Sequence, residues 1–474
     1  MANINRRAFL NGAGALGFLG GAGVLSGLNA MGAHAADTTG YKALVCIFLK
    51  GGIDHADTVL PYDQPSYDML RGVRTGLFNT YNANSSGSSR NRQNLLKLNP
   101  ENAGDFGGRE FALPVQLSPL HDMFESGELA VVGNVGPLIE PTTRTQYEAR
   151  SVALPKRLFS HNDQQSTWMA LGVEGARFGW GGKFADAALA SDPSANPLFA
   201  AITARSNDVF LSGETARQFQ AQSGGPVDLN VIQNRSILGR NDAGDAARAR
   251  MQEFFGRSDF GSSNLFERDS AAASGRAVRN TEDYKQAVEN GLGVSTVFPN
   301  SGLGGQLRTV AETIAIRNLL GVGRQVFYVT DGGYDTHSNQ AGSLTNRHTQ
   351  IAEAMAAFRT AMLEIGDWNN VTMFTMSDFG RTTIDNGDGT DHGWGGHHFV
   401  AGGAVNGKRV YGDIPQADLG SEDYTKSRGR LIPGISVEQY AASLGSWFGL
   451  DQNELNAALP NLQNFNTSSV NVFV

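Results

Sequence analysis

The sequence predicts an α/β protein built on a doubly wound, mostly parallel sheet, and two patterns carry this prediction. Short apolar runs, rich in β-branched and large residues, recur along the chain and have the length of buried strands. Helical patterns lie between them, such as residues 351–365, where Ala, Glu and Met accompany apolar positions at helical spacing. Because strands that alternate with helices pair side by side in the same direction, the chain is expected to form a parallel sheet.

The apolar runs place four of the strands. They lie at residues 43–49, 129–133, 325–330 and 371–376. The first contains the chain's single cysteine, Cys46, and ends at Gly51-Gly52. One cysteine excludes an intramolecular disulfide, and its apolar neighbours favour a buried strand residue over a catalytic thiol, which needs an exposed, electropositive setting.

The N-terminus has the three parts of an export signal. A twin arginine, Arg6-Arg7, precedes a Gly-rich apolar stretch from Gly12 to Leu28, and Ala33-His34-Ala35 offers a cleavage site. We expect residues 1–35 to be a twin-arginine signal peptide, and the mature protein to be periplasmic or extracellular. The alternative is an uncleaved anchor, but a spanning helix needs about 20 solidly apolar residues. The twin-arginine export machinery is therefore the first expected partner.

Composition bounds the rest of the chain. The formal net charge of -8 disfavours nucleic acid as a partner, and no stretch after the signal is apolar enough to stay in a membrane. Residues 36–474 are expected to form the α/β domain. Residues 81–108 are expected to be irregular, and about 187–305 to be a mostly helical insertion or cap.

Polar residues gather directly after the predicted strands, where open parallel sheets bind their ligands. These residues are Asp54 and His55; Asp335 and His337; Asp378 and Arg381; and Asp391, His392, His397 and His398. Carboxylates and imidazoles at one sheet edge are the ligands of zinc, manganese, calcium or magnesium. The alternative is structural, with Asp capping helices while His and Gly shape turns.

Two further residues have a structural and a functional interpretation. Ser160 precedes a helical pattern, so it is either an N-cap or a nucleophile held where a helix N-terminus stabilises an anion. Arg381 either neutralises an anionic substrate or pairs with a structural carboxylate.

Several of these segments together resemble a large family of twin-arginine-exported bacterial proteins, a domain of unknown function related to the alkaline phosphatase/sulfatase superfamily. The resemblance covers nearly the whole mature chain. The segments that carry it are 48–54 with 58–62, Ser160-His161, 334–337, 377–381, 389–393, and the C-terminal Ile432-Pro433, Tyr440-Ala441 and 447–450.

The resemblance implies a three-layer α/β/α sandwich and assigns roles by position. Asp54, Asp335, His337 and Asp378 would be metal ligands, with Asp391 and His392 from the next loop also at the metal site. Ser160 would be the nucleophile. Phe379 stands where the superfamily keeps a ligand histidine, which removes one ligand from the expected two-metal site unless His392 fills the gap. The site would therefore hold one metal, an altered pair, or none.

Two functions follow from this combination. The first is a metal-dependent hydrolase of phosphate or sulfate esters, in which Ser160 attacks, Arg381 neutralises charge, and His161 or His397 donates the proton. The second is a catalytically eroded, non-enzymatic secreted protein that binds a surface polymer or a partner. The departure at Phe379 and the insertion favour the second.

Overall fold

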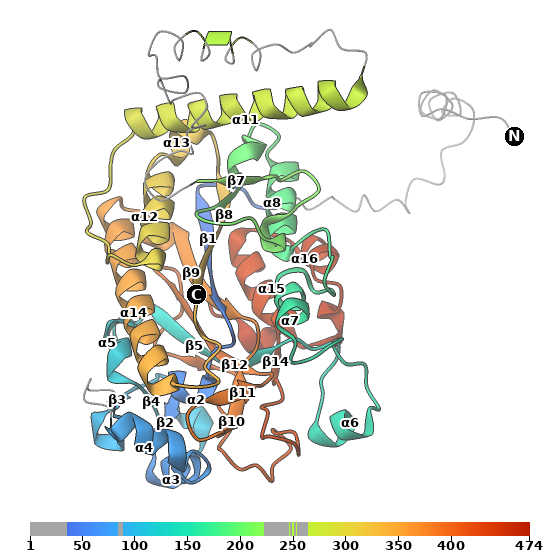
Figure 1. Ribbon diagram of the computed structural model, residues 1–474. Helices are drawn as coiled ribbons and strands as arrows, with labels where there is room; N and C mark the ends of the chain where they lie inside the picture. The colour runs from blue at the N-terminus through green and yellow to red at the C-terminus, as the bar shows by residue number, and fades with distance from the viewer. Residues whose placement is uncertain (1–35, 84–88, 222–245, 247–248, 251–252, 254–263) are drawn as a thin grey trace, which may run out of the picture. The chain divides into compact units, whose positions relative to one another are not determined.

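The computed structural model describes residues 36–83, 89–221, 246, 249, 250, 253 and 264–474, and within these ranges nine strands form one sheet (Figure 1). Its order is β13-β5-β12-β9-β1-β8-β6-β7, with β14 also paired to β5. The strands are β1 (Lys42–Lys50), β5 (Leu129–Gly136), β6 (Ala201–Thr203), β7 (Gln218–Gln220), β8 (Arg324–Gly332), β9 (Val371–Ser377), β12 (Gly396–Gly402), β13 (Val410–Tyr411) and β14 (Ile435–Ser436). The four strands expected from the apolar runs are confirmed as β1, β5, β8 and β9.

The sheet is parallel except for one strand. β1 pairs in parallel with both β8 and β9, whereas β12 is antiparallel to β5 and to β9. The sequence analysis placed His397 and His398 in a loop after the fourth strand, but both lie inside the buried strand β12. An antiparallel strand can follow its neighbour through a short connection, so β12 lacks the helix that separates the other strands.

Helices cover both faces of the sheet (Figure 1). One face carries α5 (Ser118–Glu125), α12 (Gly302–Ala315) and α14 (Gln340–Glu364), and the other carries α7 (His161–Ala170), α8 (Trp180–Ser191), α15 (Val437–Phe448) and α16 (Gln452–Ala458). Alternate residues of β1 enter the two cores, with Val45 and Ile47 on the first face and Cys46 and Phe48 on the second. Because successive side chains of a strand point to opposite faces, an almost uninterrupted apolar strand needs cover on both sides. The three-layer α/β/α arrangement is confirmed.

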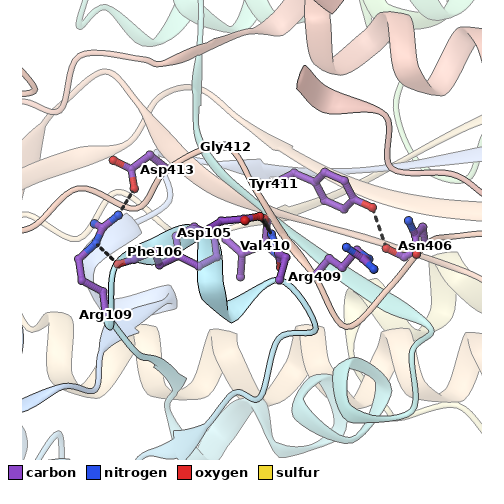
Figure 2. A pocket seen from close by; sticks show the side chains of 10 residues that line it. Asp105, Phe106, Arg109, Asn406, Arg409, Val410, Tyr411, Gly412 and Asp413 are labelled. Atoms are coloured by element: carbon purple, nitrogen blue, oxygen red, sulfur yellow. Dashed lines mark hydrogen bonds and ion pairs between the residues drawn. The ribbon is translucent and has the colours of Figure 1, made fainter. Parts of the chain in front are cut away.

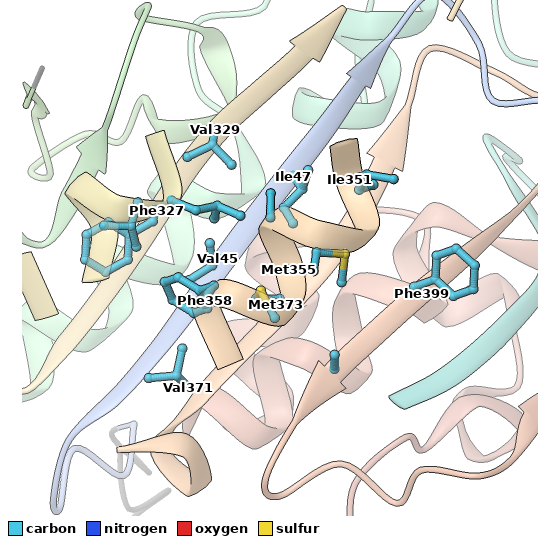
Figure 3. Packing of buried hydrophobic residues seen from close by; sticks show 14 of the residues in the cluster. Val45, Ile47, Phe327, Val329, Ile351, Met355, Phe358, Val371, Met373 and Phe399 are labelled. Atoms are coloured by element: carbon cyan, nitrogen blue, oxygen red, sulfur yellow. The ribbon is translucent and has the colours of Figure 1, made fainter. Parts of the chain in front are cut away.

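Packing under α14 shows how the sequence fixes this arrangement. Its residues Ile351, Met355 and Phe358 recur at helical spacing and face the sheet, confirming the helix expected at 351–365 (Figure 3). They share one core with residues of four strands: Val45, Ile47, Phe327, Val329, Val371, Met373 and Phe399. Each fully buried side chain of this size contributes roughly 1.5–3 kcal/mol. This core holds the strand ends, and therefore the loops after them, at fixed positions.

The other α-helices and two small sheets lie outside the elements named above. The helices are α2 (His55–Thr58), α3 (Gln64–Val73), α4 (Thr75–Ala83), α6 (Arg144–Ala149), α11 (Leu265–Asn290) and α13 (Arg317–Leu320), and the small sheets are β2 (Leu60–Pro61) with β4 (Phe111–Leu113) and β3 (Leu96–Lys97), and β10 (Arg381–Asp385) with β11 (Thr390–His392). None of the described helices is long and apolar enough to cross a membrane.

Two predicted regions lie partly or wholly outside the described residues. The expected signal peptide, residues 1–35, lies wholly outside them. The expected insertion at 187–305 includes α11 and the start of α12, but also β6 and β7, which extend the main sheet at its edge. Because much of 222–263 is outside the description, the insertion as a whole stays a prediction.

Candidate metal centre

Four side chains from separate elements meet beyond the carboxyl ends of β8 and β9. His161 is the first residue of α7, Asp335 and His337 follow β8, and His392 ends β11. Nitrogen or oxygen atoms of His161, Asp335 and His392 all lie within 4.8 Å of one another. The polar residues that the sequence analysis expected to gather at a sheet edge thus include a group with the composition of a metal site.

Asp335 is the centre of this group. Its Oδ1 lies 3.1 Å from His337 Nε2 and 3.3 Å from His392 Nε2, and its Oδ2 lies 3.5 Å from His161 Nε2. The two imidazole nitrogens of His337 and His392 are 2.9 Å apart. The side chain of Asp335 is 43% exposed and that of His337 45%, so the group opens to solvent.

The opposite ring nitrogen of each histidine has an acceptor. His161 Nδ1 lies 2.6 Å from Asp378 Oδ2, His337 Nδ1 lies 3.2 Å from Asp391 Oδ1, and His392 Nδ1 lies 2.8 Å from the Phe159 carbonyl oxygen. Carboxylates and carbonyls only accept, so each Nδ1 carries the proton and donates it. In that tautomer, Nε2 is the ring nitrogen whose lone pair can bind a cation.

The lone pairs of the three nitrogens and the negative charge of Asp335 repel one another, so a cation between them would stabilise the group. Metal-binding histidines characteristically donate their second nitrogen to a carboxylate or a backbone carbonyl, which fixes the tautomer and the ring orientation. All three histidines here have that arrangement. Ligand atoms of a tetrahedral zinc ion lie about 3.3 Å apart, given bonds of about 2.0–2.1 Å, and the separations around Asp335 bracket that value.

Arg381 holds Asp335 in place. Its buried guanidinium donates from Nη1 to Asp335 Oδ1 at 2.7 Å and to the Gly51 carbonyl at 3.1 Å. Nη2 donates to the Thr390 carbonyl, and Nε to Thr390 Oγ1 at 3.3 Å. Burial opposes ionisation of Asp335, but the hydrogen bond and charge of Arg381 together with the nearby histidines outweigh it and lower the pKa of the carboxyl group. Arg381 thus pairs with a carboxylate, one of its two expected interpretations.

Asp54 lies in a closed environment. Arg74 donates Nη1 to Asp54 Oδ2 at 2.7 Å and Nη2 to Oδ1 at 2.8 Å, and Gln340 Nε2 donates to Oδ2 at 2.5 Å. The carboxylate also caps α2 through the Ala56 amide at 3.2 Å. Burial alone would raise the pKa of Asp54, but the charge of Arg74 lowers it. The structure brings Asp54 to the same end of the sheet, with both oxygens already bonded.

Asp378 is also occupied, but by a residue of the candidate centre. The Gly51 amide donates to its Oδ1 at 3.0 Å, and His161 and Gln165 donate to its Oδ2 at 2.6 and 2.9 Å. It therefore orients His161. Gly51, at φ 120°, is required here, since a Cβ would lie 2.3 Å from the Asp335 amide nitrogen.

Phe379 supports two of the imidazoles. Its buried ring lies with its centroid 4.9 Å from that of His161 and 4.6 Å from that of His392. A side chain on Gly52 would come within 2.6 Å of it. An apolar wall thus stands where the family resemblance implied a ligand histidine.

Burial and pairing shift the two histidine pKa values in opposite directions. The hydrogen bond to Asp378 raises the pKa of His161, whereas burial lowers the pKa of His392. Asp391, which receives the His337 proton, is also paired with Arg428. Burial would raise the pKa of Asp391, but the hydrogen bond with His337 lowers it.

Ser160 and His397 make their contacts elsewhere. Ser160 Oγ donates to Asp163 Oδ2 at 2.9 Å and does not cap α7. His397 is buried in β12, where its Nδ1 accepts from the Asn134 amide at 2.9 Å and its ring packs against His55. Burial lowers the pKa of His397 well below its usual value. Their catalytic roles stay predictions.

The sequence analysis missed Arg74, Gln340, Gln165 and the Phe159 carbonyl. Arg74 lies between α3 and α4, and Gln340 opens α14, so neither follows a predicted strand. A backbone carbonyl carries no residue-type signal at all. Nothing in the sequence singles out these partners, because their role depends on contacts across up to 286 positions.

A separate cavity of about 470 Å³ lies beside the edge strand β13 (Figure 2). Its lining includes Arg109, Arg409, Tyr411 and Asp413, and none of the candidate site residues. Arg109 is paired with Asp413, and Arg409 with Glu101 at 3.0 Å. Since no histidine is among the lining residues of this cavity, the open histidine group is the stronger candidate for a metal site.

The fold and this group define an α/β protein with a candidate metal centre at its strand ends. The chain belongs to the family described as "Protein of unknown function (DUF1501)", whose model matches residues 41–459. The family resemblance seen in the sequence is confirmed. No curated protein matches the chain.

Solved structures similar to the chain include a sulfatase, a synthase and a phosphatase. The PsFucS1 sulfatase from Pseudoalteromonas sp. is 6% identical, with 87% of this chain and 68% of that chain covered and a TM-score of 0.36. The lipoteichoic acid synthase LtaP from Listeria monocytogenes is 8% identical, with 89% and 76% covered and a TM-score of 0.31. The alkaline phosphatase from the Antarctic bacterium TAB5 is 12% identical, with 77% and 92% covered and a TM-score of 0.26. These scores are too low to carry an argument, so function is inferred from the chain's own residues.

Proposed function

We propose that this protein is a metal-dependent hydrolase of phosphate or sulfate esters with a single metal centre formed by His161, Asp335, His337 and His392. One observation carries the proposal: three histidines point unprotonated nitrogens toward one carboxylate, and each is held there by a hydrogen bond on its other nitrogen. Without a cation, the Nε2 atoms of His337 and His392 would face each other at 2.9 Å, so the arrangement fits a bound divalent ion.

The donor set narrows the metal. Calcium and magnesium prefer oxygen ligands, whereas imidazole nitrogen suits zinc and other transition metals. The three imidazole nitrogens therefore favour zinc among the four metals considered, and the carboxylate oxygen is also compatible with manganese. The bonded state of Asp54 and Asp378 supports one ion rather than two, because neither carboxylate has an oxygen left without a partner.

The metal and the residues around it would have distinct roles at this centre. When bound, the metal would polarise the ester and lower the pKa of a bound water. Arg381 positions Asp335, and Asp378 positions His161. The overall reaction adds water to an ester R–O–X, so that X leaves with one hydroxyl and R–OH takes the proton.

The attacking group is tested by one substitution. Ser160 lies beside His161, but its hydroxyl donates to Asp163. If Ser160 is the nucleophile, Ser160→Ala abolishes turnover and no covalent adduct forms. If Ser160→Ala retains most of the turnover, water is the attacking group and the serine role is wrong.

Metal analysis of the purified full chain tests the proposal as a whole. We expect about one zinc or manganese per chain, turnover of aryl phosphate or aryl sulfate by the loaded protein, and loss of both in Asp335→Asn. Asp68→Asn, an exposed aspartate on α3, is the matched control and should change neither. A loaded protein that turns over no ester would instead support the non-enzymatic binding protein, and a protein that never retains metal would overturn the centre itself.

Export would follow from the N-terminal segment. We infer that Arg6-Arg7 directs the chain through the twin-arginine machinery, which carries folded proteins. A centre assembled from residues 161 to 392 exists only after folding, so its metal would be taken up before export. If Arg6→Lys with Arg7→Lys leaves both export and metal content normal, this inference is wrong.

A further inference from the structure

We propose that two basic loops beside the metal centre form a binding rim for a polyanionic chain, so that the substrate is a polymer with repeated phosphate or sulfate groups. The catalytic part of this inference rests on the proposed function, whereas the binding part does not. The loops are residues 150–161 and residues 424–430, which we call the basic rim.

Both loops contact the centre directly. The first contributes the Phe159 carbonyl, which accepts from His392 Nδ1, and ends at His161 itself. In the second, Arg430 Nε donates to the His392 carbonyl at 2.9 Å, and Arg428 pairs with Asp391. The guanidinium of Arg430 also lies 3.9 Å from the centre of the Phe159 ring, so the loops pack against each other.

The rim concentrates positive charge in an acidic protein. Its basic residues are Arg150, Lys156, Arg157, Lys426, Arg428 and Arg430, and neither loop contains an acidic residue, although the chain as a whole has a net charge of -8. The side chains of Arg157 and Arg428 each pair with one carboxylate, Asp163 at 3.5 Å and Asp391, and are still 72% and 59% exposed. Clustered cations of this kind attract anions over several ångströms.

The buried arginine of the centre cannot take this role. Arg381 donates hydrogen bonds to Asp335, Gly51 and Thr390. Other cations must therefore neutralise the negative charge of a bound ester. Two rim arginines contact residues at the centre, Arg428 through Asp391 and Arg430 through the His392 carbonyl. Substrate recognition thus shifts from the centre to the two loops.

The open geometry favours a polymer over a small ester. Sites for small ligands are concave and bury most of the ligand surface, whereas Asp335 and His337 are each more than two-fifths exposed. An extended chain can instead place one ester at the metal while its other anionic groups pair with the rim. Several weak pairs on one chain add to a useful affinity.

The backbone of the rim is held in an uncommon conformation. Eight non-glycine residues have a positive φ in the described part of the chain, and four of them are in the rim: Arg150, Arg157, Phe159 and Arg428. Such conformations cost energy and persist where the surroundings enforce them, often at ligand sites. In Phe159 this conformation accompanies the turn of its carbonyl toward His392.

Binding of dextran sulfate and of polyphosphate by the full chain tests the rim, with neutral dextran as the blank. The rim variant carries Arg150→Gln, Lys156→Gln and Lys426→Gln, none of which belongs to the centre. The control variant carries Arg71→Gln, Arg276→Gln and Arg308→Gln, exposed cations on α3, α11 and α12 with the same total change in charge. We expect Kd for at least one polyanion to rise at least tenfold in the rim variant and less than threefold in the control, and salt to weaken binding by the wild type more steeply than by the rim variant.

The two polyanions identify the ester class, and Asp335→Asn separates binding from catalysis. This variant should lose metal but still bind the polymer. A polymer-binding rim without turnover of any ester would overturn the proposed hydrolase while supporting the rim. Equal losses in the rim and control variants, or tighter binding of single-stranded DNA than of either polyanion, would overturn the rim.

Discussion

Asp54 and Asp335 follow neighbouring parallel strands, β1 and β8, yet the structure gives them opposite environments. Asp54 is buried, and both of its oxygens accept from Arg74 while Gln340 donates to one of them. Asp335 is partly exposed, accepts from one arginine, and faces three imidazole nitrogens. We call the surroundings of Asp54 the closed region and those of Asp335 the open region.

The comparison shows that the role of a carboxylate at a strand end depends on which side chains contact it. A buried aspartate with a bidentate arginine contributes to the stability of the fold and has little to offer a cation. A carboxylate whose oxygens lie close to histidine nitrogens can bind a cation together with them. Residue type and strand position are the same in both cases, so only the partners separate structural from functional use.

The largest expected effect is a loss of stability when the cation beside Asp54 is removed from the closed region. Arg74→Met leaves the Asp54 carboxylate buried without its cation, which should lower the free energy of unfolding by about 3–5 kcal/mol. Urea unfolding of the metal-free protein measures this. Asp335→Asn is the comparison variant and should cost less than Arg74→Met, since its partly exposed side chain keeps an oxygen that can accept from the buried Arg381 guanidinium. Equal unfolding curves for Arg74→Met and the wild type would show that the pair does not stabilise the fold.

The next effect breaks the open region. Asp335→Asn should weaken zinc affinity by more than the roughly 10- to 100-fold that loss of an outer-shell partner costs. Competition with a zinc chelator measures the affinity, and Asp68→Asn again provides the matched control. An unchanged zinc affinity in Asp335→Asn would show that Asp335 is not a ligand and would contradict the proposed centre.

A smaller effect separates a ligand from its support. Asp391→Ala removes the acceptor of His337 Nδ1 and should lower zinc affinity about 10-fold to 100-fold without abolishing binding. Asp68→Ala, at an exposed aspartate on α3 away from the centre, serves as the control and should leave the affinity unchanged. A loss as great as that in Asp335→Asn would mean that Asp391 itself is a ligand.

The smallest effect concerns a histidine that interacts electrostatically with Asp54 and Asp57 in the closed region. His348 is buried in α14, neither ring nitrogen has a hydrogen-bond partner among the described residues, and burial lowers its pKa to about 4 from 6.5. As pH falls from about 6.5 to about 4, the unfolded chain binds a proton that the native chain does not, so stability is lost in that window and levels off below it.

At about pH 5 this loss amounts to roughly 2 kcal/mol. His348→Leu should remove it, so the variant gains stability relative to the wild type as pH falls from about 7.5 to 5. Thermal unfolding at both values measures the difference. A gain that does not depend on pH would attribute the effect to packing rather than to protonation.

Much of the fold could be predicted because it depends on local pattern. The strands at β1, β5, β8 and β9 and the helix α14 follow from apolar periodicity, which is a property of consecutive residues. The strand β12 could not, since its sequence GHHFVAG has only three consecutive apolar residues, and it is held by pairing with β5 and β9. For the candidate site, the sequence supplied the residue types and their positions after strands.

The sequence by itself determined the sheet, the family, and the gathering of Asp and His at one edge. Only the tertiary structure decided which of these side chains face one another with unshared electron pairs and which are neutralised. Arg74 reaches Asp54 across 20 positions, and Arg381 reaches Asp335 across 46. Such pairs form when packing brings distant segments within hydrogen-bonding distance, and no local pattern records which donor will arrive at which carboxylate.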